Sequence, residues 1–284
     1  MSNLLDPKQD YIFKNIFGVE KNKKLLLSLL NAILDDEPHI NDLTMRNTEI
    51  SKILKEDKTT RLDVRARTNT GTEIDIEIQC QNTGEIPERA AHYTARMLPR
   101  NIKSKESYKN SHVIGIWILG ENINDRVAPV SNVYLTYQPT DTDAPQIMTE
   151  CIRIITIELA KFNPRTANLN DMLTAWLSFL KAPEFLDESY LKNKEVEEAM
   201  DILEYISADD EVREIADLRE RTQNDKNSEI TTAEERGEKR GEENERKKNA
   251  LAMKNNVRTM KAKGFDNKLI AECLGITEAE VETL

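Results

Sequence analysis

Two strictly alternating segments joined by a turn constrain this chain more than any other part of its sequence. The segments cover residues 61–67 and 72–79, and Asn69, Thr70 and Gly71 supply typical turn residues between them. Successive side chains of a β-strand project to opposite faces, so each segment predicts one polar and one apolar face. We therefore expect an antiparallel hairpin within a sheet whose apolar face packs against other elements.

The polar face of this hairpin brings acidic side chains together. Its second strand places four residues on that face: Glu73, Asp75, Glu77 and Gln79. In the first strand Asp63 lies on the same face as three arginines. The turn can bring Asp63 close to Glu77 on the paired strand. Two carboxylates within ~5 Å repel each other unless a cation or a proton lies between them. Mg²⁺ suits such a pair, because it takes oxygen ligands and is commonly held by one or two carboxylates.

The same alternation also fits an ordinary edge hairpin. A half-exposed antiparallel pair has one polar and one apolar face without any catalytic site. We interpret Asp75, which lies between the other acids, as a surface residue. Alternation alone leaves the catalytic and the structural interpretation of the acidic face open.

The other patterns of the first 160 residues predict a mixed α/β sheet with the hairpin near its middle. Helical periodicity covers 10–18, 21–34 and about 87–105. Further strands are expected at 43–50, 112–119, 133–137 and 152–158. The run at 112–119 is continuously apolar, which is typical of a strand buried on both faces.

Strand patterns end near residue 168, and the rest of the chain is helical by periodicity. Helices are expected at 169–180, 195–206 and 212–221. The segment 233–248 carries six acids and six bases, and it fits either a solvated helix with a weak coiled-coil seam or a flexible linker. We expect four parts: a core at 1–165, a helical subdomain at 166–222, a charged segment at 223–250 and a small helical module at 251–284.

The C-terminal module predicts two short helices separated at Gly275. Thr277 and Glu280 have the spacing of a capping box at the start of the second helix. The pair resembles half of a helix-turn-helix, but its second helix is acidic. It is either a small packing or dimerising module or a DNA-reading one.

Charge is unevenly distributed along the chain. The net charge of −11 argues at first sight against a nucleic-acid partner, because phosphate binding is largely cationic. However, residues 187–220 hold 13 acids and four bases, whereas residues 89–109 hold six bases and one acid. The first half therefore keeps a basic patch that is compatible with DNA.

The sequence also indicates the cellular compartment of the protein. No apolar run approaches the ~20 residues of a membrane span, and the start lacks the features of a signal peptide. Cys80, Cys151 and Cys273 lack metal-ligand spacing and are expected to be reduced structural thiols. We expect a cytoplasmic protein without a membrane partner.

Two blocks of the first half match a known pattern. Residues 10–18 read D-Y-I-F-K-N-I-F-G, similar to a D-x-x-F-K-x-x-F-G signature. The hairpin contributes Asp63 and residues 76–79, in which Gln79 replaces the lysine of the superfamily pattern. The hairpin block by itself is too short to identify a family. It becomes specific only because it occurs in order with the other blocks.

A third block lies on the helix expected after the hairpin. Arg89, Tyr93 and Arg96 are spaced i, i+4 and i+7, which forms one stripe of that helix. Together with the charged segment and the C-terminal module, these blocks resemble the Rpn family of recombination-promoting nucleases, also described as PD-(D/E)XK nuclease family transposases. The resemblance spans nearly the whole chain. One departure is segment 104–108, where relatives often place a glycine before the tyrosine.

The resemblance implies an α/β fold of the restriction-endonuclease-like PD-(D/E)XK type, with a mixed sheet core flanked by helices and followed by a helical C-terminal region. It implies a DNA endonuclease that uses Mg²⁺ or another divalent cation and is linked to recombination or mobile elements. Asp63 and Glu77 would be metal ligands, with the backbone carbonyl of Ile78 as a third. Gln79 would lie near the attacking water, which it can orient without supplying a charge.

Further residues are candidates for accessory roles. Asp10 adds a carboxylate or caps the first helix, and Lys14 contacts phosphate or is a plain surface residue. The helix stripe binds phosphate or packs against the acidic sheet face, and both can hold at once. The stripe comprises Arg89, Tyr93 and Arg96, extended by Arg100. His92 lies beside it and is the one histidine with a candidate catalytic position.

Three functions compete at this point. The first is the DNA endonuclease, and the second is a catalytically decayed nuclease fold that acts as a DNA- or protein-binding module. The third is an RNA-directed or toxin-like nuclease, which no residue distinguishes from the first. Cutting both DNA strands ordinarily needs two active sites, so the charged helical tail suggests a homodimer.

Overall fold

The computed structural model describes most of the 284 residues. The described ranges are 4–35, 39–46, 64–79, 84–101, 112–123, 128–137, 144–167 and 169–284. Two compact units divide the chain, Met1–Leu218 and Arg219–Leu284. The first unit contains the sheet.

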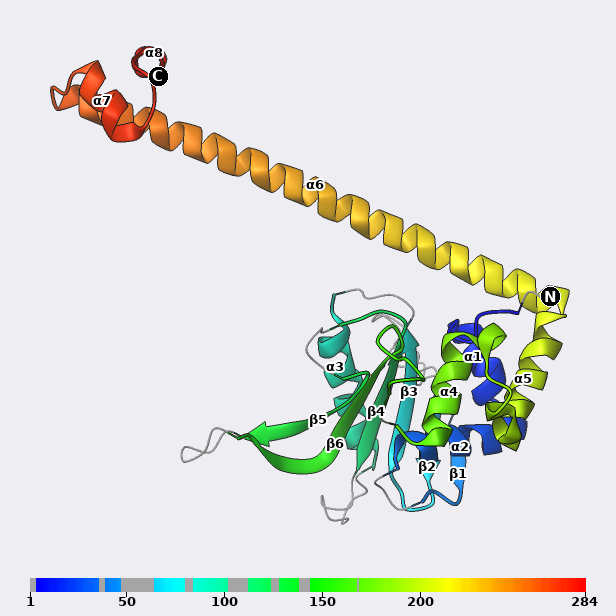
Figure 1. Ribbon diagram of the computed structural model, residues 1–284. Coiled ribbons are helices and arrows are strands. Elements are labelled where there is room, and N and C mark those ends of the chain that lie inside the picture. Colours follow the sequence, from blue (N-terminus) through cyan, green and yellow to red (C-terminus); the bar gives the residue numbers. More distant parts are fainter. Residues whose placement is uncertain are drawn as a thin grey trace. The chain divides into compact units, whose positions relative to one another are not determined.

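Six strands form one mixed sheet in the order β1-β2-β3-β4-β6-β5 (Figure 1). The strands are β1 (Leu43–Arg46), β2 (Val64–Thr68), β3 (Glu73–Gln79), β4 (Val113–Leu119), β5 (Val130–Tyr137) and β6 (Gln146–Glu158). β1, β2 and β3 are antiparallel, β3, β4 and β6 are parallel, and β5 is antiparallel to β6. The mixed sheet expected from the sequence is confirmed.

The hairpin of β2 and β3 lies inside the sheet. Its turn closes with a hydrogen bond from Thr68 N to Thr72 O, and Gly71 adopts a φ of 94°, a conformation that side chains other than glycine rarely tolerate. β1 pairs with the outer side of β2, and β4 pairs with the other side of β3. The edge-hairpin interpretation is therefore wrong, because the apolar strand β4 (Val113–Leu119) completes β3.

Four helices cover the isoleucine face of this sheet (Figure 1). They are α1 (Asp10–Phe17), α2 (Lys23–Ile33), α4 (Asp171–Lys181) and α5 (Lys194–Ser207), accompanied by short 3-10 turns at Glu20–Asn22, Pro183–Phe185 and Tyr190–Lys192. α1 ends where Gly18 N donates to Lys14 O. In the core between helices and sheet, the Trp176 ring lies 5.4 Å from the Phe17 ring, and Trp176 Nε1 donates to Ser28 Oγ at 3.1 Å.

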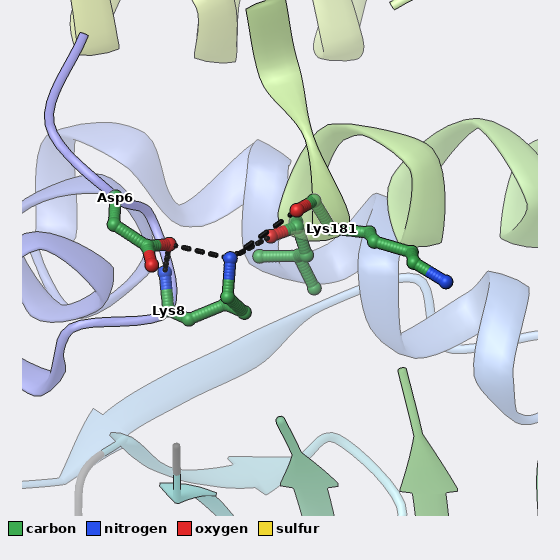
Figure 2. Close-up of polar contacts among 4 residues, drawn as sticks. Asp6, Lys8 and Lys181 are labelled. Atoms are coloured by element: carbon green, nitrogen blue, oxygen red, sulfur yellow. Dashed lines mark hydrogen bonds and ion pairs between the residues drawn. The ribbon is translucent and has the colours of Figure 1, made fainter. Parts of the chain in front are cut away.

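The segment before α1 is tied to the last turn of α4. Lys8 Nζ donates to the carbonyl oxygens of Leu180 and Lys181 at 3.4 and 3.2 Å, and it lies 2.8 Å from Asp6 Oδ1 (Figure 2). The last carbonyls of a helix lack partners inside the helix, and a cation there also interacts favourably with the helix dipole. Lys8 therefore fastens the N-terminal segment to the helical layer.

The opposite face of the sheet is covered by α3 (Ile86–Asn101) (Figure 1). Ile86 and Ala90 of α3 pack on Trp117 and Leu119 of β4. The approach is close because Gly115 carries no Cβ. A Cβ built there would lie 2.1 Å from Thr94 Oγ1 of α3.

The second unit is helical. α6 (Asp210–Ala262) begins in the first unit and runs through the charged segment 233–248, so that segment is helix and not linker. α7 (Asn267–Leu274) and α8 (Glu278–Thr283) pack around Val257, Ile270, Ala271 and Val281, and the expected capping box of Thr277 and Glu280 is confirmed. The four-part division expected from the sequence stays a prediction. No helix in the described ranges combines the length and apolar character needed to cross a bilayer.

The cysteines of the described residues are free thiols. Cys151 is partly buried and Cys273 is exposed. Cys80 lies outside the described residues.

Candidate functional site

The acidic face of β3 lies under α3. Glu77 is the register partner of Trp117, and register partners on neighbouring strands project to the same side of a sheet. Since Trp117 packs under α3, the four polar residues of β3 share that side. Glu73, Asp75 and Glu77 are all buried, and Asp75 is only 2% exposed. Our interpretation of Asp75 as a surface residue is wrong, because α3 and the flanking strands cover this face.

Arginines from β2 accompany the buried acids. Arg65 Nη2 lies 3.1 Å from Glu73 Oε2, and Arg67 Nε lies 4.0 Å from Glu73 Oε1. Arg65 is itself buried, so this ion pair is shielded from water. Burying two charges is tolerable only when they are paired closely, which makes each partner dependent on the other.

One arginine of α3 reaches the outer end of the acidic row. Arg89 Nη2 lies 3.8 Å from Glu77 Oε1, and Arg89 Nη1 donates to Gln79 Oε1 at 3.5 Å. The guanidinium carbon is 5.6 Å from the Trp117 ring centroid and 5.7 Å from the Tyr93 ring centroid. Arg89 is thus held by a carboxylate, an amide oxygen and two aromatic rings. A contact with the acidic face, one of the two roles left open for the stripe, is confirmed for Arg89.

The other stripe residues behave differently. Tyr93 is half-buried, and its ring lies 5.9 Å from the Trp117 ring, so it contributes packing between α3 and β4. Arg96 is half-buried on the same helix, and Arg100 belongs to α3 although its side chain lies outside the described part. The exposed ring of His92 lies 6.0 Å from the Tyr93 ring. Phosphate binding by the stripe stays a prediction.

The first carboxylate of the expected metal pair, Asp63, lies outside the described residues. Its successor in the sequence, Val64, pairs with Ile76, which directly precedes Glu77. The hairpin register next to both predicted ligands is therefore known. The role of Asp63 itself stays a prediction.

The N-terminal candidates come from the other side of the sheet. α1 packs on the isoleucine face, whereas Glu77 and Gln79 project from the opposite face. Asp10 is the first residue of α1 and Gln9 is its N-cap, so the interpretation of Asp10 as the cap is wrong. Asp10 is instead an acid in the first helical turn, where it interacts favourably with the helix dipole. Accessory roles for Asp10 and Lys14 at the site stay predictions.

The oxygen donors of β3 fit a hard divalent cation. Glu77 offers a carboxylate, Gln79 an amide oxygen and Ile78 a backbone carbonyl, and Mg²⁺ prefers such oxygen ligands together with water. Within the described ranges, no group of three His, Cys, Asp or Glu residues could hold a metal by itself. The described donors would therefore supply only part of such a site, and one more carboxylate would have to be added.

Glu158 is a buried acid that sequence patterns did not single out. It pairs with Leu119, which pairs with Gln79, so the three positions form one row at the carboxyl ends of parallel strands. Its Oε2 accepts from Ile123 N and pairs with Lys161 Nζ, both at 2.8 Å. Glu158 thereby fixes the loop after β4. The signal available in the sequence was the position of Glu158, a charged residue at the end of the expected strand 152–158.

Comparison with known families agrees with this geometry. A family described as PD-(D/E)XK nuclease family transposase matches residues 7–233, which include the whole sheet and α3. Comparisons with curated proteins and with solved structures gave no match. The family supports a nuclease or transposase-related role, and PD-(D/E)XK nucleases generally use divalent metal ions. With a mixed six-stranded sheet, flanking helices and a match over most of its length, the chain belongs to the PD-(D/E)XK nuclease family transposases.

Proposed function

We propose that this protein is a Mg²⁺-dependent DNA endonuclease that hydrolyses phosphodiester bonds in recombination or in the movement of genetic elements. One observation carries the proposal. Glu77 and Gln79 lie on one face of the central strand β3, under a helix that directs Arg89 at both of them. A buried carboxylate beside an amide and a guanidinium offers oxygen ligands for a metal and nitrogen donors for a phosphate.

The proposed roles follow from the chemistry of each side chain. Glu77 and Asp63 hold the cation, and the carbonyl of Ile78 is a third ligand. When bound, the cation polarises the scissile phosphate and lowers the pKa of a coordinated water. Gln79 is uncharged and orients polar groups at the reacting phosphate. The low exposure of Glu77, at 7%, keeps its charge poorly screened, which strengthens its attraction for a cation.

DNA is the proposed substrate, and α3 provides its approach. Arg89, Tyr93, Arg96 and Arg100 lie along one helix, and the basic segment 89–109 gives local attraction despite the net charge of −11. Asp10 and Lys14 are proposed as accessory residues from α1. Because phosphate contacts release counterions, affinity should fall steeply with salt concentration.

The decisive experiment is plasmid cleavage with and without Mg²⁺. We expect the wild type to cleave only with Mg²⁺, and we expect Glu77→Ala to reduce the rate by about 10³-fold or more, because metal catalysis supplies several kcal/mol. Glu204→Ala on α5 is a matched control, since Glu204 is exposed on the helical layer. Cleavage by Glu77→Ala at the rate of the control, or without metal, would refute the assignment.

One observation favours a second function, a binding module that has lost catalysis. Arg89 places a positive charge 3.8 Å from Glu77 Oε1, which opposes a metal ion at that carboxylate. A binding module would show no Mg²⁺-dependent rise in melting temperature, and Asp63→Ala would leave its DNA affinity unchanged or higher. The endonuclease should show the Mg²⁺-dependent rise and lose it in Asp63→Ala.

Substrate class, assembly and compartment complete the proposal. Cleavage of labelled DNA and RNA of the same sequence distinguishes the endonuclease from the RNA-directed alternative.

A homodimer is proposed for cutting both strands, and light scattering at working concentration tests it. A cytoplasmic location is proposed and can be checked by cell fractionation.

A further inference from the structure

We infer that Arg89 supplies the positive charge that Gln79 lacks, and that Gln79 is the positioning residue for the Arg89 guanidinium. The inference rests on the proposed nuclease function. The superfamily name PD-(D/E)XK denotes a lysine two residues after the second acid, whereas this chain has Gln79 two residues after Glu77, and a glutamine side chain carries no charge. Arg89 from α3 brings a cation to that position from a different element of the fold.

The two ends of the guanidinium bridge positions 77 and 79. Nη1 donates to Gln79 Oε1 at 3.5 Å while Nη2 lies 3.8 Å from Glu77 Oε1. Both acceptors belong to the same face of β3, two residues apart. The charge of Arg89 therefore lies at the residue-79 end of the site, where a lysine side chain at that position would carry its own charge.

Two aromatic rings hold Arg89 in this place. The guanidinium carbon lies 5.6 Å from the ring centroid of Trp117, which is buried, and 5.7 Å from that of Tyr93. Cations within about 6 Å of an aromatic centroid are attracted to its face. The two rings and Gln79 restrict the guanidinium, so less conformational entropy is lost when it meets a substrate.

Arg89 keeps donors available for a phosphate. Its side chain is 27% exposed, whereas that of Glu77 is 9% exposed. A guanidinium has five N–H donors, and a single hydrogen bond to Gln79 uses one of them. Arginine is suited to binding phosphate oxygens through two parallel hydrogen bonds. Arg89 can thus contact a phosphodiester while Gln79 still orients it.

The arrangement makes positions 79 and 89 interdependent. A lysine at position 79 would place a second cation within a few ångströms of Arg89, and like charges at that distance repel. A neutral residue at both positions would leave the site without either cation. The site therefore requires one positive charge, and either position 79 or position 89 can carry it.

This interdependence gives a reciprocal test with three variants and a control. Arg89→Met removes the charge, Gln79→Lys adds one, and the double variant Arg89→Met/Gln79→Lys moves the charge from helix to strand. Arg165→Met is the matched control, because Arg165 is exposed in the loop after β6. Circular dichroism and melting temperature verify folding, and Arg89→Gln replaces Arg89→Met if the latter does not fold.

The first measurement requires no turnover. Affinity for a fluorescein-labelled DNA duplex is measured by anisotropy with Ca²⁺ in place of Mg²⁺. We expect Arg89→Met to weaken binding about 10-fold or more, since charge-assisted hydrogen bonds to phosphate are strong ones. Arg165→Met should stay within about 2-fold of the wild type, and the double variant should regain most of the affinity lost in Arg89→Met.

The second measurement is Mg²⁺ affinity, followed through protein stability. Arg89→Met should bind Mg²⁺ several-fold more tightly, because a cation 3.8 Å from Glu77 Oε1 no longer opposes the metal. The double variant should return toward the wild-type value. A role of Arg89 in packing alone would leave Mg²⁺ affinity unchanged.

Single-turnover cleavage completes the test. We expect Arg89→Met to cleave about 10²-fold more slowly and the double variant to recover at least about 10-fold. If the wild type cleaves and Arg89→Met cleaves equally well, the inference fails while the nuclease function stands. If the wild type does not cleave, the nuclease function fails, and the DNA affinities still decide whether charge at either position restores phosphate binding. A double variant that binds DNA no better than Arg89→Met overturns the inference.

Discussion

The two faces of strand β3 are both buried, yet they are buried against different surroundings. Ile74, Ile76 and Ile78 meet the apolar layer of α1, α2, α4 and α5, whereas Glu73 and Glu77 meet arginines beneath α3. An apolar side chain gains roughly 1.5–3 kcal/mol from full burial. A buried charge costs free energy unless a partner offsets it. Burial of the apolar face therefore stabilises the fold by itself. Burial of the charged face is tolerated only because specific ion pairs offset its cost.

Unsatisfied polar atoms mark the charged face. Arg65 Nε, Glu73 Oε2 and Glu158 Oε1 are buried without a hydrogen-bond partner among the described residues, although Glu73 Oε2 lies 3.1 Å from Arg65 Nη2. Leaving such atoms unsatisfied costs stability, and it is typically tolerated where function requires it. The contrast between the two faces leads to four predictions on stability, beginning with the largest expected effect.

Trp176→Ala should have the largest effect, because it opens a cavity in the apolar layer. Trp176 is fully buried between Phe17 and Phe179, so we expect a loss of about 3–5 kcal/mol in the free energy of unfolding. Urea unfolding of the variant and the wild type measures it. Trp176→Phe keeps much of the volume and should lose less. Equal losses in the two variants would show that volume is not what this face requires.

Arg65→Met should destabilise the charged face by a different mechanism. It leaves Glu73 buried without its closest cation, which we expect to cost about 3 kcal/mol. Arg67, 4.0 Å from Glu73 Oε1, limits the loss. The double variant Arg65→Met/Glu73→Met should be more stable than Arg65→Met, since no uncompensated charge remains. A double variant that is less stable would show that this face tolerates charges better than apolar side chains.

Gly115→Ala tests how closely α3 packs on the charged face. The new Cβ would meet Thr94 Oγ1 at 2.1 Å, so the Thr94 side chain or α3 has to shift, and overpacking of this kind costs about 1–3 kcal/mol. Thr94→Ala removes the clashing oxygen, and the double variant should regain most of the lost stability in thermal unfolding. The shift should also lower cleavage by moving Arg89. Unchanged stability in Gly115→Ala alone would mean that α3 is loosely held.

The Lys23–Asp42 pair at the surface should have the smallest effect. Lys23 Nζ lies 2.6 Å from Asp42 Oδ1, and this hydrogen bond holds the pKa of Asp42 below its ordinary value and that of Lys23 above it. A lowered carboxyl pKa stabilises the fold above the unfolded pKa of about 4, and this stabilisation is lost as pH falls through the folded pKa. A raised lysine pKa stabilises the fold below about pH 10.5, and this contribution is lost as pH rises through the folded pKa.

Asp42→Asn should therefore lower the melting temperature slightly at pH 7 and low salt, and not at a pH below the folded pKa of Asp42. Asp217→Asn on the exposed side of α6 is the control. High salt should abolish the difference, because surface pairs are screened. A difference that persists at low pH would show that Asp42 acts through packing.

Local patterns predicted the secondary structure well. The apolar run at 112–119 indicated a strand buried on both faces, and β4 occupies that position. The charged segment 233–248 was left open between helix and linker, and it is helix. Its opposite charges three and four residues apart stabilise a helix without an apolar face, as the ion pair between Glu243 and Lys247 shows.

The candidate site was only partly predictable. Alternation placed Glu77 and Gln79 on one face, and the structure bears this out. The interpretation of Asp75 as exposed and the alternative of an edge hairpin are both wrong, whereas the expected mixed sheet with the hairpin near its middle is confirmed. Exposure depends on which element packs over a face, and residues 61–79 carry no information about α3.

By itself the sequence determined which residues share a face, because the two-residue period of a strand and the spacing of a helix stripe follow from backbone geometry. The tertiary structure alone decided that both faces of β3 are buried and that Arg89 contacts Glu77 and Gln79. That contact requires α3 to lie close against β4, which the missing side chain of Gly115 permits. Its physical basis is therefore packing between elements, which no local period encodes.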